Sequence, residues 1–453
     1  MNNFIAARTL QTYPVGAYRW LMLGLTVLAT ILASYEFQLA PLLPILLPFL
    51  HMSHLGYGYF ITFIVLVSGV SAFVGGPLAD RYGRVVLIDI CLGAVTILTF
   101  SNVLITGVVS FVLIRTAMGI VGGLMAGAGA ALVRDMSPRL SRATAFGLFT
   151  IGPVGASFLA NAIAGATLPV FHTWQSQIWI MGALGVLMYI PILLWLKDLS
   201  PELRLQVFRS EIAAMQAEGR RIPSAAEIPA SAREAFAALL EHAEVWLLVI
   251  GATANLTLYF AIQAFGPLMF TEAYHYSPAV AARMNANFWF TNLAVLIVTG
   301  MVSDRLESRK PIAIIGGILS AALMWLWAGT FGHQISPTTV RAIATVLGCV
   351  LAVGYVPWAA QFSETLEDVS PALQATGWAF FGLIARGWVA ISAPLSLFVA
   401  IHYGWGAWVR VAMIGMILYV GAMCLSRTRF AMSKAVEPGK AAELAKAASG
   451  ALE

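Results

Sequence analysis

Apolar stretches of about 20 residues recur along the whole chain, and they restrict its fold more than any other feature. One of them, residues 374–400, carries a single charged side chain, Arg386. A helix rises about 1.5 Å per residue, so a stretch of this length crosses the hydrocarbon core of a bilayer. Only 10% of the residues are charged, whereas soluble proteins have about 25%. The sequence therefore predicts an all-α polytopic membrane protein.

Twelve apolar stretches can be separated by their polar connections. We predict membrane-spanning helices over residues 19–47, 57–79, 86–105, 108–132, 143–169, 176–197, 244–270, 280–302, 311–331, 339–362, 374–400 and 404–426. Pro41, Pro44 and Pro48 predict a kink or an early end in the first helix, because proline lacks the helical hydrogen-bond donor. The first apolar run has no small-residue cleavage site, so we expect a retained span and not a signal peptide.

Basic residues predict the orientation. If the N-terminus is cytoplasmic, all but five of the 26 Lys and Arg residues lie on the cytoplasmic side. The exceptions are Arg115, Arg283, Arg341, Arg386 and Arg410. Cytoplasmic loops are enriched in Lys and Arg, so we place both termini in the cytoplasm and the protein in the cell (inner or plasma) membrane. The net charge of +5 is then a topological signal, and we expect no nucleic-acid partner.

Two loop sequences occur twice. The second and eighth predicted helices are followed by "GPLADRYGR" (76–84) and "GMVSDRLESRK" (300–310), and the fourth and tenth by "DMSPRL" (135–140) and "DVSPAL" (368–373). These loops correspond if six helices were duplicated into twelve, which predicts two pseudo-symmetric six-helix halves.

The predicted regions are a cytoplasmic N-terminus (1–18), an N-terminal bundle (19–197), a central loop with short helices (198–243), a C-terminal bundle (244–427) and a cytoplasmic tail (428–453). Within the central loop, Ser200 as an N-cap and Pro201 at the first helical position predict a helix, with Gly219 as its stop.

The first repeated loop fits Gly-x-x-x-Asp-Arg-x-Gly-Arg, and this pattern resembles the signature of the major facilitator superfamily between its second and third helices. The resemblance covers about residues 15–430. It implies twelve helices in two halves and transport by alternating access. It also implies that the charged loop acts as a latch, which stabilises one of two global conformations of the transporter. The loop residues are Gly76, Asp80, Arg81, Gly83 and Arg84, with Asp89 expected to belong to the same latch and Asp304, Arg305 and Arg309 as the second copy.

A second element of that superfamily is Arg-x-x-x-Gly in the fourth helix, present as Arg115 and Gly119. The resemblance links this arginine to proton coupling. The exporter signature of the fifth helix is only partly met, because Leu148, Ala156 and Ser157 occupy glycine positions. This mismatch weakens a prediction of efflux.

Glu36 is the one acid well inside the first predicted helix. A buried carboxyl group that is exposed alternately to each side of the membrane can load and release a proton. The alternative is a permanent ion pair between Glu36 and Arg115 that only joins two helices. We predict a proton-coupling role for both residues.

Arg386 lies near the middle of the eleventh predicted helix, where a charge is costly. No acid in the C-terminal half lies at a similar depth, since Glu364, Glu367 and Asp368 are at the cytoplasmic end. A carboxylate substrate would satisfy the guanidinium in a bidentate fork. Symporters of organic acids in the superfamily similarly carry an arginine in this helix. The alternative partners are backbone carbonyls or another helix.

Polar and aromatic side chains at helical spacing outline the rest of the predicted site. The candidate substrate-binding residues, with Arg386, are Tyr35, Gln38, Asn255, Tyr259, Gln263, Trp289, Asn292, Tyr355, Trp358, Gln361 and Trp378. The alternative is that the amides join helices and the tryptophans anchor helix ends.

The chain shows neither a nucleotide-binding loop nor a catalytic constellation, so we predict no enzymatic activity. The predicted function is proton-coupled uptake of a small organic anion: a carboxylate, a sugar acid or an aromatic acid. We expect no metal or bound cofactor beyond the proton gradient, a monomer in the lipid bilayer, and a small anionic substrate. The alternative is a proton-driven efflux antiporter of drugs or metabolites.

Overall fold

A computed structural model describes residues 8–136, 142–204, 206, 232–306, 309–369 and 374–426. The N-terminal half consists of short strands and helices in the order β1 Thr9–Leu10, α2 Gly16–Tyr35, η1 Ala40–Leu42, α3 Leu43–Phe49, α4 His54–Tyr82, α5 Arg84–Ser101, η2 Asn102–Leu104, α6 Val108–Met136, α7 Arg142–Phe171, α8 Trp174–Trp195 and β2 Asp198–Leu199. The C-terminal half consists of α10 Ala232–Leu240, α11 Ala243–Tyr274, α12 Pro278–Arg305, α13 Lys310–Ala328, α14 Pro337–Val369, α15 Gln374–Tyr403 and α16 Trp405–Leu425.

Twelve spans in the described residues are long and apolar enough to cross a membrane, which confirms the predicted number. Each predicted helix matches one of them, although several helices extend beyond the predicted ends. The largest difference is in the first span, which is broken between Tyr35 and Ala40. The prolines predicted a kink, and the break lies just before Pro41.

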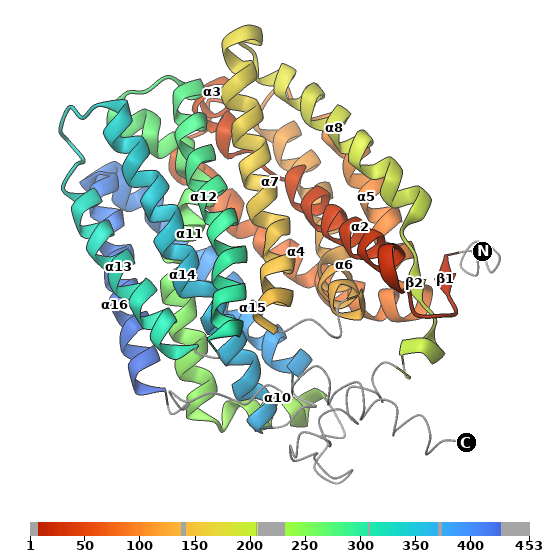
Figure 1. The fold of residues 1–453 in the computed structure, drawn as a ribbon. Coiled ribbons are helices and arrows are strands. Elements are labelled where there is room, and N and C mark those ends of the chain that lie inside the picture. Colours follow the sequence, from red (N-terminus) through yellow and green to blue (C-terminus); the bar gives the residue numbers. More distant parts are fainter. Residues whose placement is uncertain are drawn as a thin grey trace, which may run out of the picture.

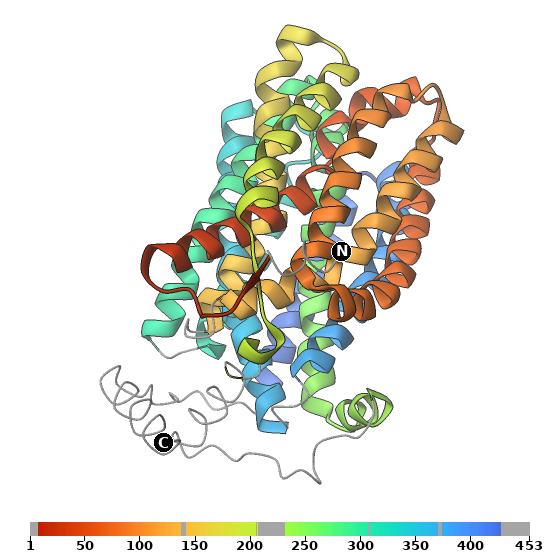
Figure 2. The same cartoon turned by 90° about the vertical axis from the view of Figure 1, so that its right-hand side faces the viewer.

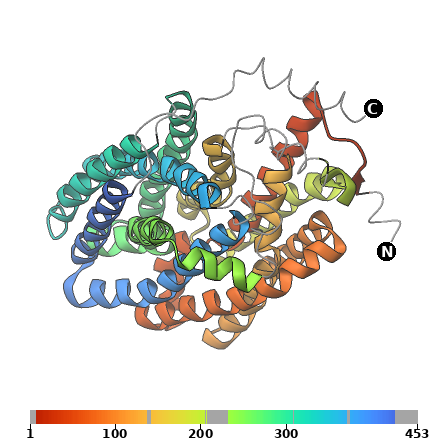
Figure 3. The same cartoon turned by 90° about the horizontal axis from the view of Figure 1, so that it is seen from below.

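The spans are long, roughly parallel helices that form one bundle, with the N-terminal half and the C-terminal half side by side (Figure 1; Figure 3 gives an end view). Strands β1 and β2 and helix α10 lie at one end, which we call the inner end. The opposite end, where α7 ends and α8 begins, is the outer end.

The two halves pack on each other mainly through two helix pairs, α7 with α12 and α4 with α15. In the second pair the backbone of α4 at Gly58 approaches α15 so closely that an added Cβ would lie 2.7 Å from the Cα of Pro394. Both Gly58 and Pro394 lie in the outer parts of their helices. The structure therefore has its halves in contact toward the outer end.

A feature that the sequence analysis missed is a short parallel pairing of β1 with β2. The N–H groups of Asp198 and Ser200 donate to the carbonyls of Arg8 and Leu10, at 2.8 and 3.0 Å. This pairing attaches the segment before α2 to the segment after α8 (Figure 2). The start of the central loop is therefore held against the inner end of the N-terminal half.

The central loop begins as predicted. The Ser200 hydroxyl accepts a hydrogen bond from the Leu203 N–H at 3.2 Å, as expected for an N-cap. Helix α10 packs on α15 through the rings of Phe236 and Phe380, whose centroids are 5.4 Å apart. The predicted stop at Gly219 and the tail at 428–453 lie outside the described residues.

Candidate functional site

The break in the first span has a clear cause in the sequence. Proline at position 41 has no N–H, so the carbonyl of Phe37 lacks the donor that a continuous helix would supply. The guanidinium of Arg115 on α6 takes that place: its Nη2 donates to the Phe37 carbonyl at 2.9 Å, and its Nη1 reaches the Glu36 carbonyl at 3.5 Å. A cation at a helix C-terminus is also favoured by the helix dipole. Arg115 therefore caps α2 inside the membrane.

The carboxyl group of Glu36 is completely buried at this break. Neither of its oxygens has a hydrogen-bond partner among the described residues. The Thr96 hydroxyl on α5 lies close by without completing a hydrogen bond of normal geometry. On α8, a Cβ at Gly185 would overlap the carboxylate. Glu36 and Arg115 come together through the backbone, and in the described residues they form no ion pair.

The predicted stripe on α11 meets α12 and α14. The hydroxyl of Tyr259 donates to Oδ1 of Asn292 at 3.1 Å, and Nδ2 of Asn292 donates to the Gly348 carbonyl at 2.9 Å. The ring of Trp289 packs edge-on against Tyr259, with centroids 5.0 Å apart. Asn292 and Trp289 are fully buried, so their described contacts are those of packing between helices.

Trp358 and Gln361 of α14 are also buried in the C-terminal half. The indole of Trp358 donates to the Leu248 carbonyl at 3.1 Å, and Nε2 of Gln361 donates to the Ser426 hydroxyl at 3.1 Å. Such contacts join α14 to α11 and to the end of α16. For Trp358 and Gln361, the alternative of packing between helices describes the geometry better than the substrate role.

Other predicted residues keep part of their surface accessible. Tyr259, Gln263, Tyr355 and Trp378 are half-buried, whereas Asn255 is buried. Tyr259 and Tyr355 lie close enough for their hydroxyl groups to interact electrostatically, which connects α11 with α14. The accessible part of the predicted polar stripe therefore lies on α11, α14 and the start of α15.

Arg386 on α15 has an exposed side chain, and it forms no hydrogen bond or ion pair with another described residue. Its guanidinium extends along α15 toward Gly382. One turn outward on the same helical face, the Ala390 carbonyl accepts a hydrogen bond from the Thr62 hydroxyl of α4 at 2.5 Å. Arg386 therefore lies on the face of α15 that is turned toward the N-terminal half.

Two predicted substrate contacts belong to the broken segment. Tyr35 is buried among Ala156, Ala160 and Met181, which come from α7 and α8. Gln38 is also buried. Tyr35 thus points away from α11 and α14, so the structure does not bring it together with the C-terminal part of the predicted site.

The first signature loop connects α4 and α5 through Gly83, whose φ of 98° suits glycine. Gly76 lies within α4. Arg81 is exposed, and its guanidinium lies over the Tyr82 ring. The side chain of Asp80 is not among those that the structure describes. Asp198 of β2 caps α5 by accepting from the Arg84 N–H at 2.8 Å.

Asp89, which was expected in this latch, instead pairs with Arg8 of the N-terminal segment. The same guanidinium donates to the Leu193 carbonyl of α8. Burial lowers the pKa of Arg8 from its usual value. The ion pair fixes the N-terminal segment to α5 and α8.

The second signature loop joins helices within the C-terminal half. Arg309 pairs with Asp304 at 2.8 Å and with Glu364 of α14 at 3.2 Å. It also donates to the Ser303 hydroxyl at 2.9 Å. Arg305 is exposed at the end of α12. The structure thus brings together Asp304, Arg309 and Glu364 at the inner end.

Sequence reasoning missed the polar contacts between the halves. Nδ2 of Asn285 on α12 donates to Oδ1 of Asn161 on α7 at 3.1 Å, and both side chains are fully buried. Nearer the outer surface, His54 of α4 pairs with Glu272 of α11 at 2.6 Å. The sequence does show amides within these two apolar helices. That these two amides pair could be recognised only from the packing of α7 on α12.

Comparison with known proteins agrees with this architecture. A model of the Major Facilitator Superfamily matches residues 22–394. The chain is 22% identical to the efflux pump radE of Floropilus chiversii, over 82% of this chain and 74% of that protein. It is 23% identical to the gallate transporter of Pseudomonas putida, over 68% and 72% of the two chains. It is 24% identical to the probable chloroplastic anion transporter 3 of Oryza sativa subsp. japonica, over 67% and 58%.

Among solved structures, the D-xylose-proton symporter has a TM-score of 0.67 at 13% identity, covering 92% of this chain and 100% of the symporter chain. This likeness concerns the fold. Twelve spans, duplicated signature loops and a family match over most of the chain lead to one conclusion. The protein is a multi-pass membrane transporter, not an enzyme, and it belongs to the Major Facilitator Superfamily.

Proposed function

We propose that the protein couples proton movement to the uptake of a small organic anion by alternating access. In this proposal both termini are cytoplasmic, the inner end faces the cytoplasm of a cell membrane, and a monomer is the working unit. No bound cofactor is needed, because the proton gradient supplies the energy. The substrate binds between the halves near the middle of the membrane.

The observation that carries the proposal is the environment of Arg386. A guanidinium in a membrane span stays charged and needs a counter-charge. Its side chain is exposed, it pairs with no other described residue, and its helical face is turned toward the other half. A carboxylate held in a bidentate fork would supply the missing charge. The half-buried Tyr259, Gln263 and Tyr355 would add polar and aromatic contacts.

Two relatives support an anionic substrate. One is named as a gallate transporter and another as a probable anion transporter. Gallate is an aromatic carboxylate, a class that suits both a guanidinium and aromatic walls. We therefore favour aromatic acids within the wider class of organic anions.

Glu36 is the proposed proton carrier. Its carboxyl group is buried without a hydrogen bond from the described residues, and the guanidinium of Arg115 is already engaged by backbone carbonyls. Protonation of Glu36 would remove a charge next to the break in the first span. We propose that this change alters the packing of the break on α6 and α8 and so biases the movement of the halves.

The experiment is uptake of labelled gallate into vesicles, with and without an imposed proton gradient. Arg386→Lys should raise the KM strongly, because an ammonium cannot form the bidentate fork. The matched control is Arg410→Lys, an exposed arginine on α16, which should leave uptake unchanged. Equal effects of the two substitutions would refute a carboxylate contact at Arg386.

Efflux by antiport is the second candidate, because the efflux pump radE matches 82% of this chain. In that case Glu36 keeps its role and Arg386 has a structural one. The direction of the gradient separates the two functions: an inward proton gradient drives accumulation of substrate in a symporter and its expulsion in an antiporter.

A further inference from the structure

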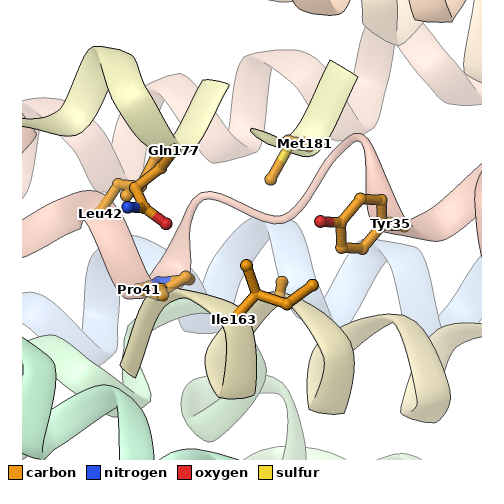
Figure 4. A pocket seen from close by; sticks show the side chains of 8 residues that line it. Tyr35, Pro41, Leu42, Ile163, Gln177 and Met181 are labelled. Atoms are coloured by element: carbon orange, nitrogen blue, oxygen red, sulfur yellow. The ribbon is translucent and has the colours of Figure 1, made fainter. Parts of the chain in front are cut away.

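A small cavity lies near Glu36, on the outer side of the break in the first span. Its walls come from the broken segment of the first span, from α7 and from α8. Figure 4 shows the lining side chains Tyr35, Pro41, Leu42, Ile163, Gln177 and Met181. The cavity has room for about one water molecule.

Two polar side chains face this space. In Figure 4 the Tyr35 hydroxyl points into the cavity, and the Gln177 amide lies on its opposite side. Gln177 is fixed there, because its Oε1 accepts a hydrogen bond from the Thr167 hydroxyl at 2.9 Å. The backbone of the broken segment runs along the cavity. A buried water needs two to four polar partners, and the Tyr35 hydroxyl and the Gln177 amide supply two.

The cavity is placed between Glu36 and the outer end. Gln177, Met181 and Gly185 occupy one face of α8 at successive turns, running inward from the outer end. Gly185 lies against the Glu36 carboxylate, and the other two residues line the cavity. Tyr35, the residue before Glu36, is close enough to interact with its charge. The other polar neighbours of Glu36 are Thr96 on α5 and Arg115, which is bound to backbone carbonyls.

The Glu36 carboxyl group itself is fully buried, so it has no direct access to the space between the halves. We propose that the Tyr35–Gln177 cavity is a water site through which protons reach Glu36 from the outer end, along a path separate from that of the substrate. The water gives a proton to the Glu36 carboxylate and regains one from the outer solution, so no other reactant is consumed. Tyr35 and Gln177 orient the water and stay neutral. This inference rests on the proposed proton role of Glu36.

The test follows protonation directly and needs no substrate. Purified full-length protein is reconstituted in one orientation, the pH outside the outer end is lowered rapidly, and the carboxylic acid C=O stretch is followed by infrared difference spectroscopy. Glu36→Gln identifies the band, because it removes that carboxyl group. We expect Tyr35→Phe and Gln177→Leu each to slow protonation by about tenfold, the effect of losing one hydrogen bond to the water in the rate-limiting step.

The matched control is Tyr189→Phe. Tyr189 lies one turn inward from Gly185 on the same face of α8, and its hydroxyl donates to the Asp89 carbonyl at 2.9 Å. This variant also loses one tyrosine hydroxyl, but it should protonate at the wild-type rate. Thermal unfolding of each variant in the same detergent shows whether slow protonation reflects damage to the fold.

The outcomes separate the two proposals. If Glu36→Gln leaves the infrared difference spectrum unchanged, the proton role of Glu36 is wrong. If the Glu36 band is present but Tyr35→Phe and Gln177→Leu protonate as fast as the wild type, only the water path is overturned. Protonation that follows a pH change at the inner end but not at the outer end would overturn it as well.

Discussion

The hydrogen bond between Asn161 and Asn285 gives the sharpest test of how the halves close at the outer end. It joins α7 to α12, and both amides are fully buried. Asn285 also packs against Gly266 of α11, where an added Cβ would lie 2.5 Å from its Oδ1. The bond forms only while the two helices are in contact. Its removal should therefore shift the protein toward a state that is open at the outer end.

The size of the shift follows from measured bonds of this kind. Hydrogen bonds between side chains in membrane helices contribute about 0.6 kcal/mol on average and up to about 1.7 kcal/mol. Asn285→Ala should thus change the equilibrium between the two states about threefold, and at most roughly twentyfold. The remaining amide of Asn161 limits the loss, because its Nδ2 still donates to the Ser157 carbonyl at 2.8 Å. Asn161→Ala should give a similar shift, and the double variant little more than either alone.

The assay is the distance between spin labels at Phe171 and Ser277, two residues at the outer ends of the halves. The native cysteines are replaced first. The control is Asn287→Ala on α12, two residues along and thus on the other side of the helix. A distance distribution for Asn285→Ala that equals that of the control would refute the argument, and so would additive effects of the two asparagine substitutions.

Three further predictions concern the ends of the bundle. Asp198→Ala should lower the free energy of unfolding by about 1–2 kcal/mol, because it removes the cap of α5. Asp198→Asn should lower it by less, and thermal unfolding in detergent compares the two variants. Arg309→Ala should loosen α12 from α14 at the inner end, seen as a broader label distance between these helices, since Glu364 loses its partner. In the wild type, the ion pair of His54 with Glu272 needs a protonated imidazole, so its contribution to closure of the outer end should weaken as the pH rises through the titration of His54. His54→Gln should remove this part of the pH dependence of opening, measured by the same label distance, and leave any part that comes from Glu36.

The number of spans was predictable because long apolar stretches have one stable arrangement in a bilayer. The break in the first span was predictable in kind from its prolines. The role of Arg115 was not, since its partners are backbone carbonyls at Glu36 and Phe37. A sequence shows side chains that need partners, but it does not show which carbonyls a proline leaves without a donor.

Some polar and aromatic residues of the predicted site are buried and others are accessible, and helical spacing could not show which are which. Trp358 and Tyr355 lie three residues apart on α14, yet Trp358 is buried against Leu248 while Tyr355 remains partly accessible. Spacing places residues on one face of a helix, but the neighbouring helices decide how much of that face stays open. The pairing of Arg8 with Asp89 was hidden for a similar reason, because it depends on the distant strands β1 and β2.

The geometry at the break also determines which form the proposed proton coupling can take. In a direct ion pair between Glu36 and Arg115, protonation would break the pair and release both side chains. Here the guanidinium stabilises the end of α2, and the carboxyl group lies against α8 at Gly185. Glu36 can therefore gain or lose a proton while Arg115 keeps its partners. In the proposed mechanism, a change of charge at residue 36 acts through the contact of the broken segment with α8, and Arg115 keeps the segment in place. On this view the break, and not a salt bridge, connects the proton to the movement of the halves.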